Sequence, residues 1–315
     1  MSRIIWDAES EKRFETGVDH GVLYVKRPRA TKVHTANSSY KKGEYFIVNT
    51  QTSNTYAVVV ALKDFTLSPA SINLSDTSTD YKVIYTGTHT GSVPTVEPGT
   101  PISEMEYTDT SNNTVTPTTF YETGVAWNGL TSVSKSPSGA EANDIYADNI
   151  KYASLRSAET FGATIEAYTY PNEFAQCNGL DETENGLYLG QQLRKSFGFC
   201  FRTDIGDDTD NGIDVNDKYK LHIIYNATAS PSEESFSTIN DSPEAITFSW
   251  EISTIPVEAG SGYLPTAILT IDKTKLTTKG KTKLATLEQV LYGTNGTEPR
   301  LPNPKDVIGF FNAAS

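Results

Sequence analysis

The chain has 315 residues, a formal net charge of −13 and only two cysteines. At this length a hydrophobic core needs no disulfide staples, and Cys177 and Cys200 have the spacing of neither a zinc site nor a disulfide framework. An acidic chain repels duplex DNA, which argues against a protein that grips nucleic acid through its phosphates.

The N-terminal stretch MSRIIWDAESEKRF has no apolar run long enough for a secretory signal or a membrane anchor, so we expect a cytoplasmic protein. A basic cluster follows, formed by Lys26, Arg27, Arg29 and Lys32. Basic runs can bind nucleic acid or anionic membranes. Because Pro28 interrupts this run and the rest of the chain is acidic, we favour an arm that meets acidic residues of a neighbouring subunit.

Residues 33–117 contain three short apolar runs, at 45–48, 56–62 and 81–85, separated by tracts rich in Ser, Thr, Asn, Pro and Gly. The runs predict strands, and the tracts predict loops. We therefore predict a small β-rich module at 33–117, inserted between 1–32 and 118–315 and lying on the outer surface.

The remainder of the chain predicts strands and one helix. In residues 245–253 apolar and polar side chains alternate, which is typical of a half-buried strand, and residues 165–170 and 197–201 show the same period. Apolar residues at helical spacing predict a helix at 283–292, with Thr282 as its N-cap and Gly293 as its end. The fold class is therefore mainly β, with one packed helix.

No chemical site is evident. The four histidines lie far apart, without carboxylates or cysteines at metal-ligand spacing, and no phosphate-binding or nucleophile motif is present. The acidic run 204–217 resembles a calcium loop, but Lys218 falls where the bidentate glutamate belongs, so a solvated hairpin tip is favoured. We predict no enzyme, no metal and no cofactor.

Several long blocks resemble siphophage major tail tube proteins, in the order that this family has them. They are YETGVAWNGLTSVSKSPSGAEANDIYADNIKYASLRSAETFGATIEAYTYPNEF at 121–174, WDAESEKRFETGVDHGVLY at 6–24, GQQLRKSFGFCFRTDIGDD at 190–208, PSEESFSTINDSPEAITFSWEISTIPV at 231–257 and LATLEQVLYGTNGTEPRLPNPKDVI at 284–308. The resemblance implies a β-sandwich or partial barrel that carries a helix on its side. It also implies a virion protein that assembles as hexameric rings, stacked into a tube through which the genome leaves.

The resemblance assigns expected roles to two sets of residues. Thr247, Ser249 and Glu251 would face the lumen, while Ile246, Phe248, Trp250 and Ile252 pack against the helix; Glu166 is a second lumen carboxylate. The alternative for the polar set is an outer solvent face. The loop 128–144, with Asn128, Pro137, Gly139 and Glu141, would contact the next ring.

The implied partners are further copies of the chain, a tape-measure protein, a tail terminator, a distal tail protein and duplex DNA that passes without specific binding. Acidic lumen walls would repel phosphates, although the net charge could equally serve solubility alone. The alternative function is a surface β-sandwich adhesin that binds carbohydrate. A β-jelly-roll hydrolase would need paired carboxylates in a cleft, and nothing in the sequence points to them.

Overall fold

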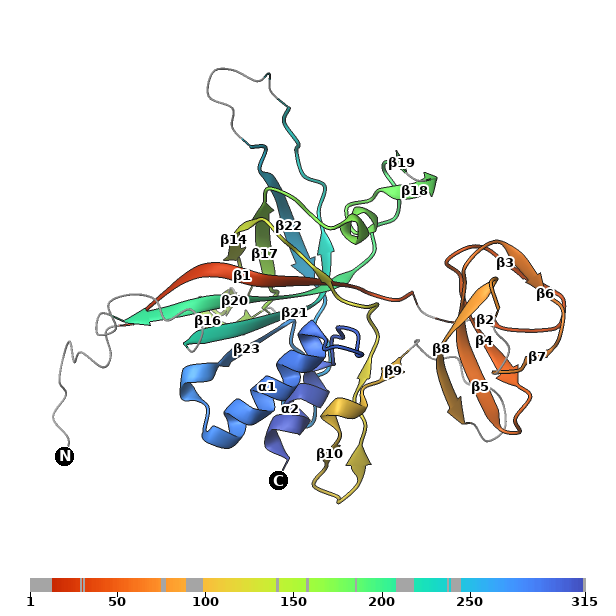
Figure 1. Ribbon diagram of the computed structural model, residues 1–315. Coiled ribbons are helices and arrows are strands. Elements are labelled where there is room, and N and C mark those ends of the chain that lie inside the picture. The colour runs from red at the N-terminus through yellow and green to blue at the C-terminus, as the bar shows by residue number, and fades with distance from the viewer. Residues whose placement is uncertain are drawn as a thin grey trace.

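The computed structural model describes residues 13–28, 30, 32–74, 78–88, 99–139, 142–156, 159–184, 186–207, 218–236, 238 and 245–313. Within them the dominant element is an antiparallel eight-stranded sheet of order β13-β1-β20-β21-β22-β17-β14, with β23 also paired to β21 (Figure 1). Its strands are β1 (Arg13–Val25), β13 (Val125–Ala126), β14 (Leu130–Lys135), β17 (Gly162–Ala167), β20 (Phe197–Asp207), β21 (Tyr219–Ala229), β22 (Phe248–Thr254) and β23 (Ile268–Asp272). The mainly β fold class is confirmed.

The two faces of this sheet bury two separate cores. Alternation along β1 shows the division, because Val22 and Tyr24 lie in one core while Leu23 and Val25 lie in the other. The first core lies under the helices α1 (Thr278–Tyr292) and α2 (Pro304–Asn312). The second contains the phenylalanines of β20 and the tryptophans Trp127 and Trp250.

The helix α1 begins earlier than the sequence predicts. Its N-cap is Thr277, whose hydroxyl accepts a hydrogen bond from the Gly280 amide at 3.2 Å, and Thr282 lies inside the helix. The predicted end is correct, since Gly293 follows the helix at φ +77°. The second helix, α2, has Pro304 at its start and was not predicted.

The predicted packing of the 245–253 strand was wrong. The strand starts at Phe248, so Ile246 and Thr247 lie before it. Trp250 packs against the rings of Trp127 and Phe174, with ring centroids 5.6 and 5.0 Å away, on the side of the sheet opposite α1. The helix instead covers β1 and β21, where the Tyr24 hydroxyl donates to the Leu291 carbonyl at 2.7 Å.

Residues 32–88 form a separate β unit, which we call the module (Figure 1, right). Its strands are β2 (Lys32–Val33), β3 (Ser38–Tyr40), β4 (Tyr45–Thr50), β5 (Thr55–Ala61), β6 (Phe65–Leu67), β7 (Ser71–Ile72) and β8 (Tyr81–Thr88). The module has hydrophobic clusters of its own, one of them built around Phe46 and Val59. The three strands predicted there are confirmed as β4, β5 and β8.

Residues 99–119 pack in the core of the main sheet beneath α1, and their first strand also contacts β8 of the module. Ile102 and Met105 are fully buried in the core beneath α1, and the Arg300 guanidinium lies 3.6 Å from the Glu104 carboxylate. The elements of this segment are β9 (Thr100–Pro101), η2 (Ser103–Met105), β10 (Tyr107–Thr108), β11 (Thr114–Val115) and β12 (Thr118–Thr119). The separate β unit is thus shorter than the predicted insert 33–117, and the division of the chain into domains stays a prediction.

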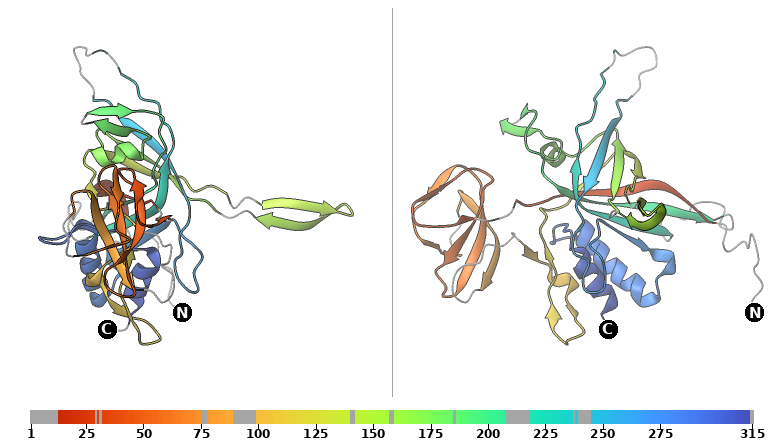
Figure 2. Two further views of the ribbon diagram at one scale, coloured as in Figure 1. Left: turned by 90° about the vertical axis from the view of Figure 1, so that its right-hand side faces the viewer. Right: turned by 180° about the vertical axis from the view of Figure 1, so that it is seen from behind.

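The remaining elements lie outside the main sheet. They are the hairpin of β15 (Ala142–Ala147) and β16 (Ile150–Arg156), the hairpin of β18 (Asp181–Glu184) and β19 (Leu187–Leu189), and the short turns η3 (Asn172–Gln176) and η4 (Lys273–Lys275). Figure 2 shows β15 and β16 projecting far from the body of the molecule.

Candidate assembly surfaces

A polar sheet face is the first candidate surface. In the register of β14, β17 and β22, Ser132 lies opposite Glu166, Glu166 opposite Ser249, and Thr164 opposite Glu251. The Ser132 hydroxyl donates to the Glu166 carboxylate at 2.8 Å. The opposite face of these strands is apolar and buried in the tryptophan core. The sequence therefore fixes which side chains share the polar face, through the period of two.

The predicted lumen residues divide between this face and its border. Glu166 and Ser249 are half-buried neighbours on it, and Glu251 is exposed on it. Thr247 is exposed but precedes β22, so it borders the face. Their lumen role stays a prediction.

The β15–β16 hairpin is the second candidate surface. Its two-residue turn, Asp148-Asn149, has both residues at positive φ, 51° and 62°, as a type I′ turn requires. The pairing places Ile145, Ile150 and Leu155 on one face of the hairpin. These three side chains are 41%, 65% and 57% exposed.

An isolated two-stranded hairpin is only marginally stable in water, and an exposed apolar face on it is typical of a surface that a partner covers. The loop predicted at 128–144 was wrong in part, because β14 occupies Leu130–Lys135 and β15 starts at Ala142. Asn128, Pro137 and Gly139 are exposed, and Glu141 lies outside the described residues. The Asp148-Asn149 pair between β-prone residues is the signal that would have located the hairpin.

The basic cluster makes contacts inside its own chain. The Lys26 ammonium donates to the Asn226 side chain at 3.1 Å, and the Arg27 guanidinium donates to the Thr100 hydroxyl. Burial lowers the pKa of Arg27. Lys32 lies 3.2 Å from Glu44 within the module. Arg29 lies outside the described residues, and the proposed contact with a neighbouring subunit stays a prediction.

A charged network joins side chains of β1, β14, β20 and β21. The His222 ring is nearly fully buried, 3.0 Å from the Lys135 ammonium and 3.0 Å from the Thr203 hydroxyl. Glu15 accepts from Thr203 at 2.6 Å and pairs with Lys220. Burial, with the nearby Lys135 charge, lowers the pKa of His222 to about 4, so the ring is neutral at pH 7.

The described residues show no arrangement for chemistry. Among them, no group of three or more His, Cys, Asp or Glu side chains is placed to hold a metal ion. None of their helices is both long and apolar enough to cross a membrane. Of the acidic run 204–217, residues 208–217 lie outside this part of the chain, so the predicted hairpin tip is not tested.

Comparison with protein families decides the class of the protein. The family model described as phage tail tube protein matches residues 104–286, which is more than half of the 315-residue chain. The chain belongs to the phage tail tube protein family. No curated protein matches it. The match spans the polar face and the hairpin, so both candidate surfaces lie in the part of this tail tube protein that the family shares.

Membership of a structural phage tail family places the protein in the virion tail and gives it a structural role. It confirms the family that the sequence blocks resemble. A tail tube is made of many copies of its subunit, so each subunit needs surfaces that bind other copies. The exposed apolar face of the hairpin is suited to such a contact.

Proposed function

We propose that this tail tube protein assembles as hexameric rings, that the rings stack into the tail tube, and that the genome leaves through the lumen. The observation that carries the proposal is the projecting hairpin, whose apolar face needs a covering partner. A second copy of the chain in the adjacent ring is that partner. The adhesin alternative is not favoured, because the family is one of structural tail proteins.

In the proposed ring the polar face of β14, β17 and β22 lines the lumen. Glu166 and Glu251 place two carboxylates per subunit on it. Phosphate-binding walls would turn sliding of DNA into a series of counterion-release steps, and carboxylates prevent this by repulsion. A tape-measure protein would fill the lumen before ejection, with a terminator and a distal tail protein at its ends. The subunits would assemble in the host cytoplasm.

The stacking contact is tested by placing charge on the apolar face of the hairpin. Ile150→Asp with Leu155→Asp removes two apolar contacts and adds repulsion between copies. Leu62→Asp in the module is the matched control, since Leu62 is 44% exposed and lies on a different unit. We expect wild type and control to form tubes by negative-stain electron microscopy as concentration rises, and the hairpin variant to stop at rings or subunits. Tubes of unchanged length from the hairpin variant would refute the proposed contact.

The lumen assignment is tested with Glu166→Lys and Glu251→Lys together. Tubes of this variant should bind duplex DNA with an affinity that falls steeply as salt is raised, because two cations per subunit would face the phosphates. Glu258→Lys, at an exposed carboxylate of the loop before β23, is the control. Equal DNA binding by the control and by the double variant would mean that the polar face does not line the lumen.

A further inference from the structure

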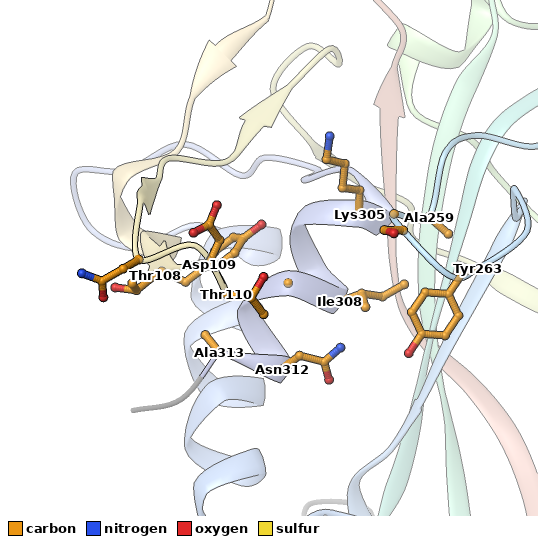
Figure 3. A pocket seen from close by; sticks show the side chains of 14 residues that line it. Thr108, Asp109, Thr110, Ala259, Tyr263, Lys305, Ile308, Asn312 and Ala313 are labelled. Carbon is orange, nitrogen blue, oxygen red and sulfur yellow. The ribbon is translucent and has the colours of Figure 1, made fainter.

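A groove runs along α2. One cavity, of about 610 Å³, lies between α2, the β10–β11 turn and the loop 259–263 (Figure 3). A second, of about 210 Å³, continues between α2 and β23. Tyr263, Ile308 and Asn312 line both cavities, which makes them one groove.

The β23 half of this groove is apolar. Leu269 and Ile271 of β23 form one wall, and Val307, Ile308 and Phe311 of α2 form the other. At its mouth Tyr263 is 59% exposed, and Leu264, the next residue, is 86% exposed. An apolar patch of this kind on a soluble subunit is typical of a surface that another segment covers.

The described part of the chain starts beside this groove. Arg13 donates from its guanidinium to the Thr274 hydroxyl at 3.4 Å, and Thr274 follows Ile271 by three residues. Twelve residues precede Arg13, and they include the apolar run Ile4-Ile5-Trp6. An extended chain advances about 3.3 Å per residue, so Trp6 can lie up to about 23 Å from Arg13. Ile271 and Thr274 are three residues apart, which is at most about 10 Å, so the groove is within reach.

The charges along this route are complementary. Between Trp6 and Arg13 the sequence carries the carboxylates Asp7, Glu9 and Glu11. The turn η4 and the first turn of α1 are basic, and their lysines are Lys273, Lys275, Lys279 and Lys281. Lys275 is 79% exposed, and its ammonium lies 3.9 Å from the Asp272 carboxylate, a loose surface contact that leaves room for a second carboxylate. Opposite charges of this kind orient a segment more than they add affinity.

We propose that the N-terminal segment 1–12 of the same subunit docks on this surface. Ile4, Ile5 and Trp6 occupy the groove between α2 and β23, and the carboxylates of 7–11 lie over the lysines beside η4. The segment closes the apolar groove within one subunit. The contact needs no second copy, so it stands or falls independently of the tube.

Cross-linking between introduced cysteines tests this docking. The native thiols do not compete, because Cys177 and Cys200 are buried and burial raises the pKa of each to about 12. The test pair is Ile5→Cys with Ile308→Cys, oxidised in dilute protein and resolved on a non-reducing gel. The matched control is Ile5→Cys with Leu193→Cys, because Leu193 is 97% exposed and follows the β18–β19 hairpin, which lies apart from α2 in Figure 1.

The expected result is an intramolecular cross-link at least tenfold more abundant in the test pair than in the control pair. It should weaken severalfold at high salt, where the contacts of the carboxylates with the lysines are screened. A cross-link that forms only between two chains would overturn the proposal in favour of a second copy as the occupant. Equal yields in both pairs would overturn it as well. Asn312→Cys, at an exposed position of the groove, replaces Ile308→Cys if that variant does not fold.

Discussion

The ion pair between β20 and α1 gives a quantitative test of how the helix is held on the sheet. Arg202 donates to the Glu288 carboxylate at 2.7 Å, and the side chains of Arg202 and Glu288 are 16% and 17% exposed. The guanidinium lies between the rings of Tyr219 and Tyr292, 4.3 and 5.0 Å from their centroids. Glu288 also accepts a hydrogen bond from the Tyr219 hydroxyl.

Glu288→Ala would leave this guanidinium largely buried and without its carboxylate. Removing one partner of a buried pair costs about 3–5 kcal/mol, since the remaining charge is uncompensated. We expect a loss of about 3 kcal/mol, because both side chains keep some contact with water. Arg202→Met combined with Glu288→Leu removes both charges and is expected to cost less than about 1 kcal/mol.

Unfolding in guanidinium chloride, followed by the fluorescence of Trp127 and Trp250 in the neighbouring core, measures these changes in the free energy of unfolding. Glu258→Ala is the control, because Glu258 and Lys305 form an exposed pair at 3.9 Å and such pairs contribute about 0–1 kcal/mol. The reasoning is refuted if Glu288→Ala costs no more than Glu258→Ala. It is also refuted if the double variant loses as much as the single one.

Three further variants test the core, the helix cap and the buried histidine. Trp250→Ala should cost about 3–5 kcal/mol in the same unfolding assay, followed by the fluorescence of Trp127, since Trp250 is fully buried among aromatic rings; a loss below about 1 kcal/mol would contradict this packing. Thr277→Ala should lower the free energy of unfolding by about 1 kcal/mol and Thr282→Ala by much less. The reverse order would show that Thr282, and not Thr277, is the N-cap of α1. The pKa of His222 is lowered from its ordinary 6.5 to about 4, so the unfolded chain takes up a proton first as pH falls. The stability that the neutral ring contributes is therefore present above pH 6.5 and is lost as pH falls towards 4, by up to about 1.4 kcal/mol per pH unit. His222→Gln should flatten this dependence of the free energy of unfolding on pH.

Local patterns in the sequence predict much of this fold. The alternation in 197–201 and 248–253 places the correct residues on each face, because the period of a strand is a property of its backbone. It does not say which layer lies over a face. Trp250 was therefore assigned to the helix, whereas residues distant in sequence, Trp127 and Phe174, cover it.

Helix boundaries and exposed surfaces were harder to predict. Apolar spacing begins at Leu284, but the first turn of α1 is a polar stretch, and only the hydroxyl of Thr277 marks its start. The β15–β16 hairpin was not predicted, since only a loop was expected at 128–144, and its apolar side chains are exposed although apolar side chains usually lie inside. The pattern of a single sequence does not show that these side chains are exposed in the folded chain.

The attachment of the module has a consequence for how such a chain can change. Arg27, which precedes the module, donates from its guanidinium to the hydroxyl of Thr100, which follows the module after the segment 89–99, and the backbone amide of Arg27 donates to the Phe120 carbonyl at 3.0 Å. The chain therefore leaves the main sheet and returns to it at one place, where Arg27 and Thr100 meet. The segment between Arg27 and Thr100 can therefore be removed, or exchanged for another folded unit, without altering the path of the main sheet, because closing a short gap costs little chain entropy. The subunit thus offers a site at which the module can be replaced by another folded unit independently of the main sheet.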